Sequence, residues 1–148
     1  MPFRLTRLAV VILLAVMASL LLSACTADEA DGSTFAMTPM DHLPHEMRQA
    51  ATAVREAYQF AGANPEILQA IPCYCGCGAM GHTSNFACYV SDVSPAGEII
   101  YDSHALGCSI CVDITQDTMR LLRQGTGLEE IRAYVDSTYA AFGPSNMP

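Results

Sequence analysis

Three cysteines occupy alternate positions in the segment IPCYCGCG, which spans residues 71–78. Side chains two residues apart point to the same side of an extended backbone, so the thiols of Cys73, Cys75 and Cys77 would share one face. A disulfide between cysteines at this spacing would need a strained loop. The glycines after the second and third cysteine can adopt left-handed backbone angles, which would fold the thiols inward. We therefore expect the three thiols to face a common partner.

Five further candidate ligands follow this segment along the chain. Cys108 and Cys111 are three residues apart at the start of a predicted helix, so they share a face, and the helix N-terminus favours thiolates there. Cys88 and two histidines lie between the two cysteine groups. The predicted ligand set comprises Cys73, Cys75, Cys77, His82, Cys88, His104, Cys108 and Cys111.

Thiolates at this density are typical of sites for Zn(II) or Cu(I), because both ions accept soft sulfur ligands that hard cations do not prefer. Four ligands close one tetrahedral zinc site. The thiols of this set exceed that number, which favours a small polynuclear Cu(I)–thiolate cluster, or a mixture of metal and disulfide, over a single zinc ion. Asp102 stands two residues before His104, and we expect it to orient that imidazole from outside the ligand set or to cap a turn.

Two other interpretations of the cysteines stay open. Their number is even, and three disulfides would stabilise a small domain in an oxidising compartment. The pair Cys108 and Cys111 also has the spacing of a thiol–disulfide oxidoreductase, although no apolar strand precedes it as in a thioredoxin-like fold. Haem of the c type is disfavoured because Val112 follows where a histidine is required. No hydrolase or nucleotide-binding motif stands out, so the sequence favours a binding protein over an enzyme.

A second group of soft ligands precedes the cysteines. Met37, Met40 and Met47 stand beside His42 and His45, and thioether and imidazole both suit copper. We interpret this group as a chance cluster in a linker, with Met47 in the hydrophobic core.

Helices are predicted to hold the cysteine loops in place. Apolar residues recur three and four positions apart in three segments, which predicts amphipathic helices at 44–61, 109–124 and 127–142. A short helix is expected after Asn64. Residues 86–101 are rich in β-prone residues around the turn sequence SPAG, which fits a short β-hairpin or an irregular loop. The predicted fold is mainly α-helical, a small bundle of three to four helices around a cysteine-rich centre, with that hairpin as an option.

Several residues carry the signals of helix ends. Asn64 fits the N-cap of the short helix, with Pro65 in its first turn. Gly125 fits a left-handed cap after the second long helix. Thr126 and Glu129 form a T-x-x-E capping box at the start of the last helix.

The N-terminus has the pattern of an export signal. Arg4 and Arg7 precede an apolar run at residues 8–22, which has the length of a signal-peptide core and is short for a membrane-spanning helix. The run ends in LSAC, which resembles a lipobox and implies cleavage before Cys25 and lipidation of its thiol, with palmitate among the acyl chains. The predicted organisation is a signal peptide at 1–24, a flexible tether at 25–43 and a cysteine-rich helical domain at 44–148.

Charge restricts the expected partners. Loss of the signal peptide removes Arg4 and Arg7 and leaves five arginines against fifteen acidic residues, with no lysine. Such an acidic chain is disfavoured as a nucleic-acid binder and as a protein that docks electrostatically on anionic lipid. A lipid anchor would hold the domain on the extracytoplasmic face of the cell membrane, near a metal transporter or a metalloenzyme assembly partner.

Four segments of the chain resemble the bacterial lipoproteins named for their PCYCGC motif. These segments are PCYCGCG at 72–78, GHTSNFACYV at 81–90, YDSHALGCSICVDI at 101–114 and GLEEIRAYVDSTY at 127–139. The resemblance implies a membrane-anchored lipoprotein whose motif positions are the eight predicted ligands, and it implies no particular activity. The predicted function is binding of Cu(I) or Zn(II) for metal storage, delivery or sensing by an extracytoplasmic lipoprotein.

Overall fold

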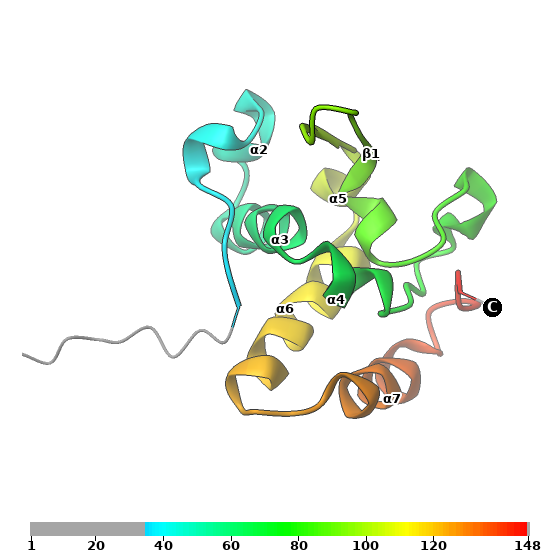
Figure 1. The fold of residues 1–148 in the computed structure, drawn as a ribbon. Helices are drawn as coiled ribbons and strands as arrows, with labels where there is room; N and C mark the ends of the chain where they lie inside the picture. Colours follow the sequence, from blue (N-terminus) through cyan, green and yellow to red (C-terminus); the bar gives the residue numbers. More distant parts are fainter. Residues whose placement is uncertain (1–34, 148) are drawn as a thin grey trace, which may run out of the picture. The chain divides into compact units, whose positions relative to one another are not determined.

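The structure is a computed structural model, and it describes residues 35–147. These residues belong to Ser33–Pro148, one of the two compact units into which the chain divides. The predicted signal peptide and Cys25 lie outside the described residues. Within 35–147 there are six α-helices and one two-stranded sheet (Figure 1), so the expected mainly α-helical fold is confirmed. None of the helices in this described part is long and apolar enough to span a membrane.

The helices follow one another in a simple order along the described chain. The α-helices are α2 (His45–Gln49), α3 (Thr52–Ala63), α4 (Pro65–Gln69), α5 (His104–Gly107), α6 (Ser109–Arg123) and α7 (Leu128–Tyr139). Short 3-10 helices lie at η1 (Met40–His42), η2 (Cys77–Met80) and η3 (Phe86–Cys88). The single helix predicted over 44–61 is divided into α2 and α3, because Ala50 and Ala51 have the extended ψ angles of 167° and 151°.

The hydrophobic core lies between α3, α6 and α7. Helix α6 runs through the middle, with α3 on one side and α7 on the other (Figure 1). From α7, Ile131, Val135 and Tyr139 are buried, and their spacing of four residues places them on one face. Each such side chain contributes about 1.5–3 kcal/mol when it leaves water. The apolar spacing over 127–142 also predicts Phe142 on this buried face, but Phe142 is 62% exposed because α7 ends at Tyr139 and the chain leaves that face.

One predicted helix cap is confirmed in position and the other does not form. Asn64 is the N-cap residue of α4 and Pro65 begins that helix, as predicted, but the Asn64 side-chain amide donates hydrogen bonds to the carbonyls of Phe60 and Ala36 and makes no cap hydrogen bond. The capping box does not form, since Gly127 is the N-cap of α7 and no side chain caps it. Gly125 has a φ of 77°, which confirms the predicted left-handed turn between α6 and α7.

The segment before α2 packs on the helical domain. The backbone N–H of Thr38 donates to the carbonyl of Gln59 in α3, and Leu43 is only 2% exposed. Earlier in the same segment, the Phe35 ring lies edge-on to Phe60 at 4.8 Å. The part of the predicted tether that the structure describes therefore packs on the helices, and its contacts begin before residue 44. The polar composition of this segment did not indicate these contacts, because they use backbone groups and the side chains of Phe35 and Leu43.

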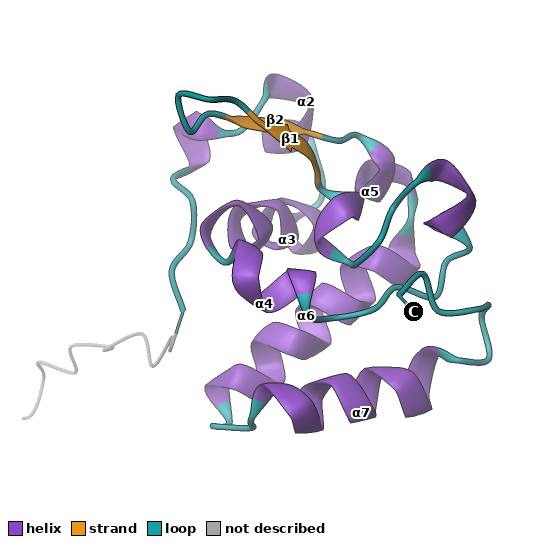
Figure 2. Ribbon diagram, turned by 45° about the vertical axis from the view of Figure 1, so that its right-hand side comes forward, coloured by secondary structure: helices purple, strands orange, loops and turns teal. Residues whose placement is uncertain are grey.

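The hairpin predicted as an option within residues 86–101 forms between β1 (Val90–Val93) and β2 (Ile99–Tyr101). The strands are antiparallel, and Gly97 turns the chain between them with a φ of 85°. Figure 2 shows this sheet on the side of α3 that faces away from α7. The hairpin carries the chain from η3 to α5 and so brings Cys88 and His104 back to the same region.

Candidate metal centre

The cysteine loop leaves α4 and turns sharply after its second cysteine. Gly76 has a φ of 80° and starts η2, as expected for a glycine that turns the thiols inward. Gly78 does not adopt the left-handed angle; the second left-handed glycine of this loop is Gly81, which ends η2 with a φ of 90°. The turn separates Cys73 and Cys75 from Cys77, so the three thiols do not form one straight row.

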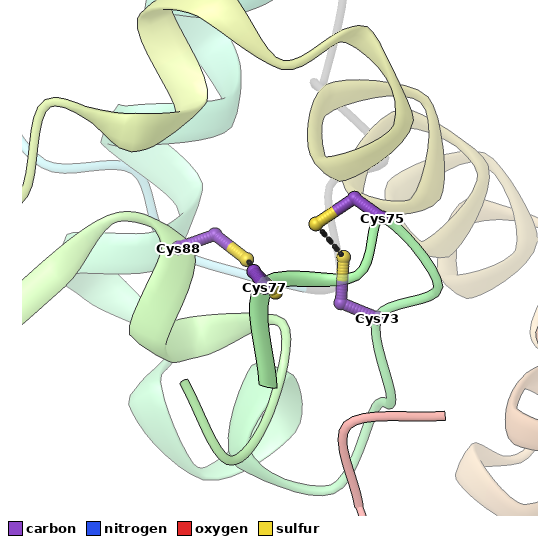
Figure 3. Close-up of side chains that lie close together, drawn as sticks. All are labelled: Cys73, Cys75, Cys77 and Cys88. Atoms are coloured by element: carbon purple, nitrogen blue, oxygen red, sulfur yellow. Dashed lines mark hydrogen bonds between the residues drawn. The ribbon is translucent and has the colours of Figure 1, made fainter. Parts of the chain in front are cut away.

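The thiols meet in two groups. The Sγ atoms of Cys73, Cys75 and Cys111 form a triangle with separations of 3.4, 3.5 and 3.5 Å. This triangle joins the loop to the first turn of α6. Cys77 and Cys88 form the second group, with their sulfur atoms 3.7 Å apart (Figure 3). The six cysteines of the described residues, with Cys108 as the sixth, are all free thiols.

The two histidines lie beside these thiols. The Nε2 atom of His104 is 3.6 Å from the Sγ atom of Cys75, and the rings of His82 and His104 are 5.0 Å apart in an edge-on arrangement. His82 is only 9% exposed, and its Nδ1 atom has no hydrogen-bond partner among residues 35–147. A buried polar atom without a partner is costly, so a ligand for it is expected.

Asp102 faces both histidines, although in different ways. Its Oδ1 atom accepts a hydrogen bond from the backbone N–H of His104, which confirms the predicted turn cap. Its Oδ2 atom lies 3.8 Å from Nε2 of His82. The carboxylate is therefore placed to orient His82, whereas the sequence pointed to His104.

The predicted ligand atoms lie close enough to share metal ions. Three groups of four residues each have all their ligand atoms within 4.8 Å of one another. The groups are Cys73, Cys75, Cys77 and Cys88; Cys75, His104, Cys108 and Cys111; and Cys77, His82, Cys88 and His104. The structure thus brings together all eight residues that the sequence proposed as ligands.

The electrostatics of the thiol triangle limit its charge. A hydrogen bond from the Cys111 thiol lowers the pKa of Cys73, and the same contact raises the pKa of Cys111. Burial raises the pKa of Cys75. The triangle accordingly favours one thiolate that its neighbours stabilise, while further thiolates are opposed by burial and by repulsion. A cation among the sulfur atoms would remove that opposition.

The C-terminal segment fastens the cysteine loop, which the sequence did not predict. The side-chain carbonyl of Asn146 accepts from the backbone N–H of Cys73 at 2.7 Å, and its amide lies 3.7 Å from the sulfur of Cys77. The same amide donates to the carbonyl of Ser84, and the N–H of Asn146 donates to the carbonyl of Cys73. The red C-terminal segment runs beside the green loop in Figure 1. No local signal marks an asparagine so far along the chain as a support for the thiols.

A buried polar network holds the start of α6 against the loops. The Tyr89 hydroxyl and the Asn85 amide both donate to the carbonyl of Cys111, at 2.8 and 3.3 Å. The Thr115 hydroxyl donates to the Asn85 side-chain oxygen at 2.7 Å. All three side chains are fully buried. Thr115 follows Cys111 by one helical turn, and that spacing is the one sequence signal that could have identified part of this network.

The methionine and histidine group near the N-terminus stays apart from the centre. Met40 is 40% exposed, and His42 and His45 are exposed as well. Met47 is 1% exposed, as expected for a core residue. None of the His/Cys/Asp/Glu groups found within residues 35–147 includes His42 or His45.

Residues 12–147 match the protein family described as a protein of unknown function with PCYCGC motif. Because the match covers most of the chain, the protein belongs to this family. No curated protein and no solved structure matches the chain.

Proposed function

We propose that the Cys/His centre binds a soft metal ion, Cu(I) or Zn(II), and that the protein stores, delivers or senses this metal. The observation that carries the proposal is the convergence of eight soft ligands into overlapping four-residue groups. The ligands come from the cysteine loop, η3, α5 and α6. They therefore converge from separate elements and are not close merely because they share one helix or strand.

The spacing of the ligand atoms supports a tetrahedral site. Zn–S bonds of about 2.3 Å place two ligand sulfurs about 3.8 Å apart on the edge of a tetrahedron. The closest sulfur pairs are separated by 3.4 to 3.7 Å, and Cys75 and His104 by 3.6 Å. Only small movements would bring these atoms to metal-bound distances. Zn(II) fits the four-residue groups, and Cu(I) fits the excess of thiolates.

The proposal is tested by titrating the reduced full chain with Zn(II) and, separately, with Cu(I) in competition with a chelator of known affinity. We expect tight binding that releases protons, because thiols must ionise to become ligands. A variant with Cys73, Cys75 and Cys77 changed to serine should lose this affinity. The matched control is Cys25→Ser, which removes a thiol outside the centre and should bind as the wild type does.

Equal affinity in the wild type and the triple variant would contradict metal binding. Quantitative thiol counting on the native protein then identifies which alternative applies. Three stable disulfides would indicate a stapled interaction module. One reversible disulfide at Cys108 and Cys111 would indicate a thiol–disulfide redox protein, which the half-exposed position of Cys108 would suit.

The cellular setting is proposed from the sequence alone. Cleavage before Cys25 and lipidation of that residue would anchor the protein on the extracytoplasmic face of the bacterial membrane. There it would exchange metal with a transporter or a metalloenzyme assembly partner. Mass spectrometry of the native N-terminus should find a diacylglyceryl-modified cysteine, and an exported protein that retains Met1 would contradict this part of the proposal.

A further inference from the structure

On the basis of the proposed metal binding, we further propose that the centre holds two ions in two separate four-ligand sites. The first is a His₂Cys₂ site formed by Cys77, His82, Cys88 and His104. The second is a Cys₄ site formed by Cys73, Cys75, Cys108 and Cys111.

The distances allow the eight ligands to be divided in this way. The His₂Cys₂ group is one of the sets whose ligand atoms all lie within 4.8 Å. Of the four remaining cysteines, Cys73, Cys75 and Cys111 form the triangle with sides of 3.4 to 3.5 Å. Cys108 is assigned as the fourth ligand because it is the one cysteine left over, and its sulfur lies within 4.8 Å of those of Cys75 and Cys111. Every ligand is then used once, and each site has the four ligands that close a tetrahedral ion.

The buried atom of His82 distinguishes this division from its competitors. Nε2 of His82 faces the Asp102 carboxylate at 3.8 Å, so Nδ1 is the atom left to bind a metal. That Nδ1 atom is buried and has no hydrogen-bond partner among residues 35–147. A carboxylate on one imidazole nitrogen and a metal on the other is the usual arrangement of a histidine ligand. Assigning Nδ1 as the His82 ligand atom of the His₂Cys₂ site gives this buried atom a partner.

None of the three pairings of the four-residue groups uses all eight ligands, and the pairing that shares Cys77 and Cys88 excludes Cys108 and Cys111. Two groups could share Cys75 as a bridging thiolate, but that arrangement excludes His82 and leaves its Nδ1 atom without a partner. Two others could share His104, which would require one imidazole to bridge two ions and would exclude Cys73. The division into separate sites needs no bridging ligand.

The two sites differ in charge and in access. With Zn(II), two thiolates and two neutral imidazoles give a neutral site, whereas four thiolates give a net charge of about −2. Burial of the cysteines does not distinguish the two sites, since Cys77 and Cys88 are 2% and 0% exposed and Cys73 and Cys111 are both fully buried. In the Cys₄ site, Cys75 and Cys108 are half-buried, and Cys108 lines a cleft of about 260 Å³ next to Leu106 and Val112. We therefore assign metal exchange to the Cys₄ site and metal retention to the His₂Cys₂ site.

The experiment is native mass spectrometry of the reduced full chain loaded with Zn(II), followed by addition of a chelator. We expect two ions per chain, one lost quickly and one slowly. His82→Ala should keep one ion, the fast one, and Cys108→Ser should keep the slow one. The matched control is His42→Ala, which removes an exposed histidine outside the centre and should keep both ions. Far-UV circular dichroism identifies any variant that fails to fold, and the two exchange phases of the wild type provide a measurement that needs no variant.

Each result has a distinct meaning. Two ions in the wild type with one in folded His82→Ala would support the division. Two ions in folded His82→Ala would overturn it in favour of the arrangement bridged by Cys75. A single ion in the wild type, or one exchange phase for both ions, would overturn the two-site inference while leaving metal binding intact. No ion in the wild type would refute the proposed function itself.

Discussion

The cysteine-rich centre and the seam between α6 and α7 are held together by different forces, although α6 belongs to both. The seam consists of apolar side chains such as Ile131 and Val135, which are fully buried. The centre consists of thiols, imidazoles and hydrogen bonds that join distant segments, for example Cys73 and Asn146 across 73 positions. Apolar burial and the hydrogen bond from Tyr139 to Asp117 stabilise the seam without a ligand, whereas the centre crowds thiols most of which resist ionisation. We infer that the seam carries the fold and that the centre depends on its ligand.

Metal removal should have the largest effect and should act on the centre first. A ligand present at about 1,000 times its dissociation constant stabilises a protein by about 4 kcal/mol, and the reduced metal-free protein should lose that amount. Amide hydrogen exchange should accelerate in residues 71–88 and less in α7. Urea unfolding with and without a chelator measures the free energy. Equal acceleration of amide exchange in residues 71–88 and in α7 would contradict the inference that the centre depends on its ligand more than the seam does.

Ile131→Ala should destabilise the seam between α6 and α7 and leave the metal centre unchanged. Ile131 is fully buried, so the cavity left behind should lower the free energy of unfolding by about 2–5 kcal/mol. Zinc stoichiometry should stay that of the wild type, because α7 provides none of the proposed ligands. The control is Leu128→Ala on the same helix, where the side chain is 36% exposed and the cost should be within about 0.5 kcal/mol. Loss of metal in folded Ile131→Ala would show that the two regions are coupled.

Asn146→Ala tests whether the C-terminal segment belongs to the centre. Its side chain accepts from the Cys73 backbone and reaches the sulfur of Cys77, so it should position both ligands. Loss of such an outer support typically weakens metal affinity by about tenfold or more. Ser145→Ala is the matched control, because that hydroxyl interacts with Met147 and Tyr74 and with none of the proposed ligands among the described residues. Competition with a chelator gives the affinities, and equal values for the two variants would exclude Asn146 as a support.

Tyr139 provides the smallest and most specific test of the seam. Its hydroxyl donates to Asp117 of α6 at 2.8 Å, and Tyr139→Phe should cost about 1 kcal/mol. Burial, followed by the hydrogen bond to Asp117, raises the pKa of Tyr139 above its ordinary value of 10.0. A raised pKa in the folded state means stabilisation that is complete below pH 10 and declines as the pH rises toward the folded value. Between about pH 9 and about pH 11 the wild type should lose more stability than Tyr139→Phe in urea unfolding, with unchanged metal content. An identical loss would contradict this role.

The helical part of the fold was predictable because its determinants are local. The apolar spacing over 109–124 and 127–142 gave helices that agree with α6 and α7 to within a few residues. The break between α2 and α3 was not predictable, because Ala50 and Ala51 are good helix formers and no glycine or proline marks the change. The prediction that Phe142 is buried was wrong for a related reason, because the apolar spacing continues past the residue where α7 ends.

The sequence by itself determined which residues are candidate ligands, because thiols and imidazoles are recognisable by type and spacing. It also determined the family, through segments that include PCYCGC. Only the tertiary structure decided which ligands meet. Cys73, Cys111 and His82 reach the centre through turns and long-range hydrogen bonds, which the spacing of residues in the sequence does not predict. The same holds for Asn146 and for the orphan Nδ1 atom of His82. The chemistry of a side chain follows from the type of each residue, whereas the distance between two ligands depends on how every intervening segment packs.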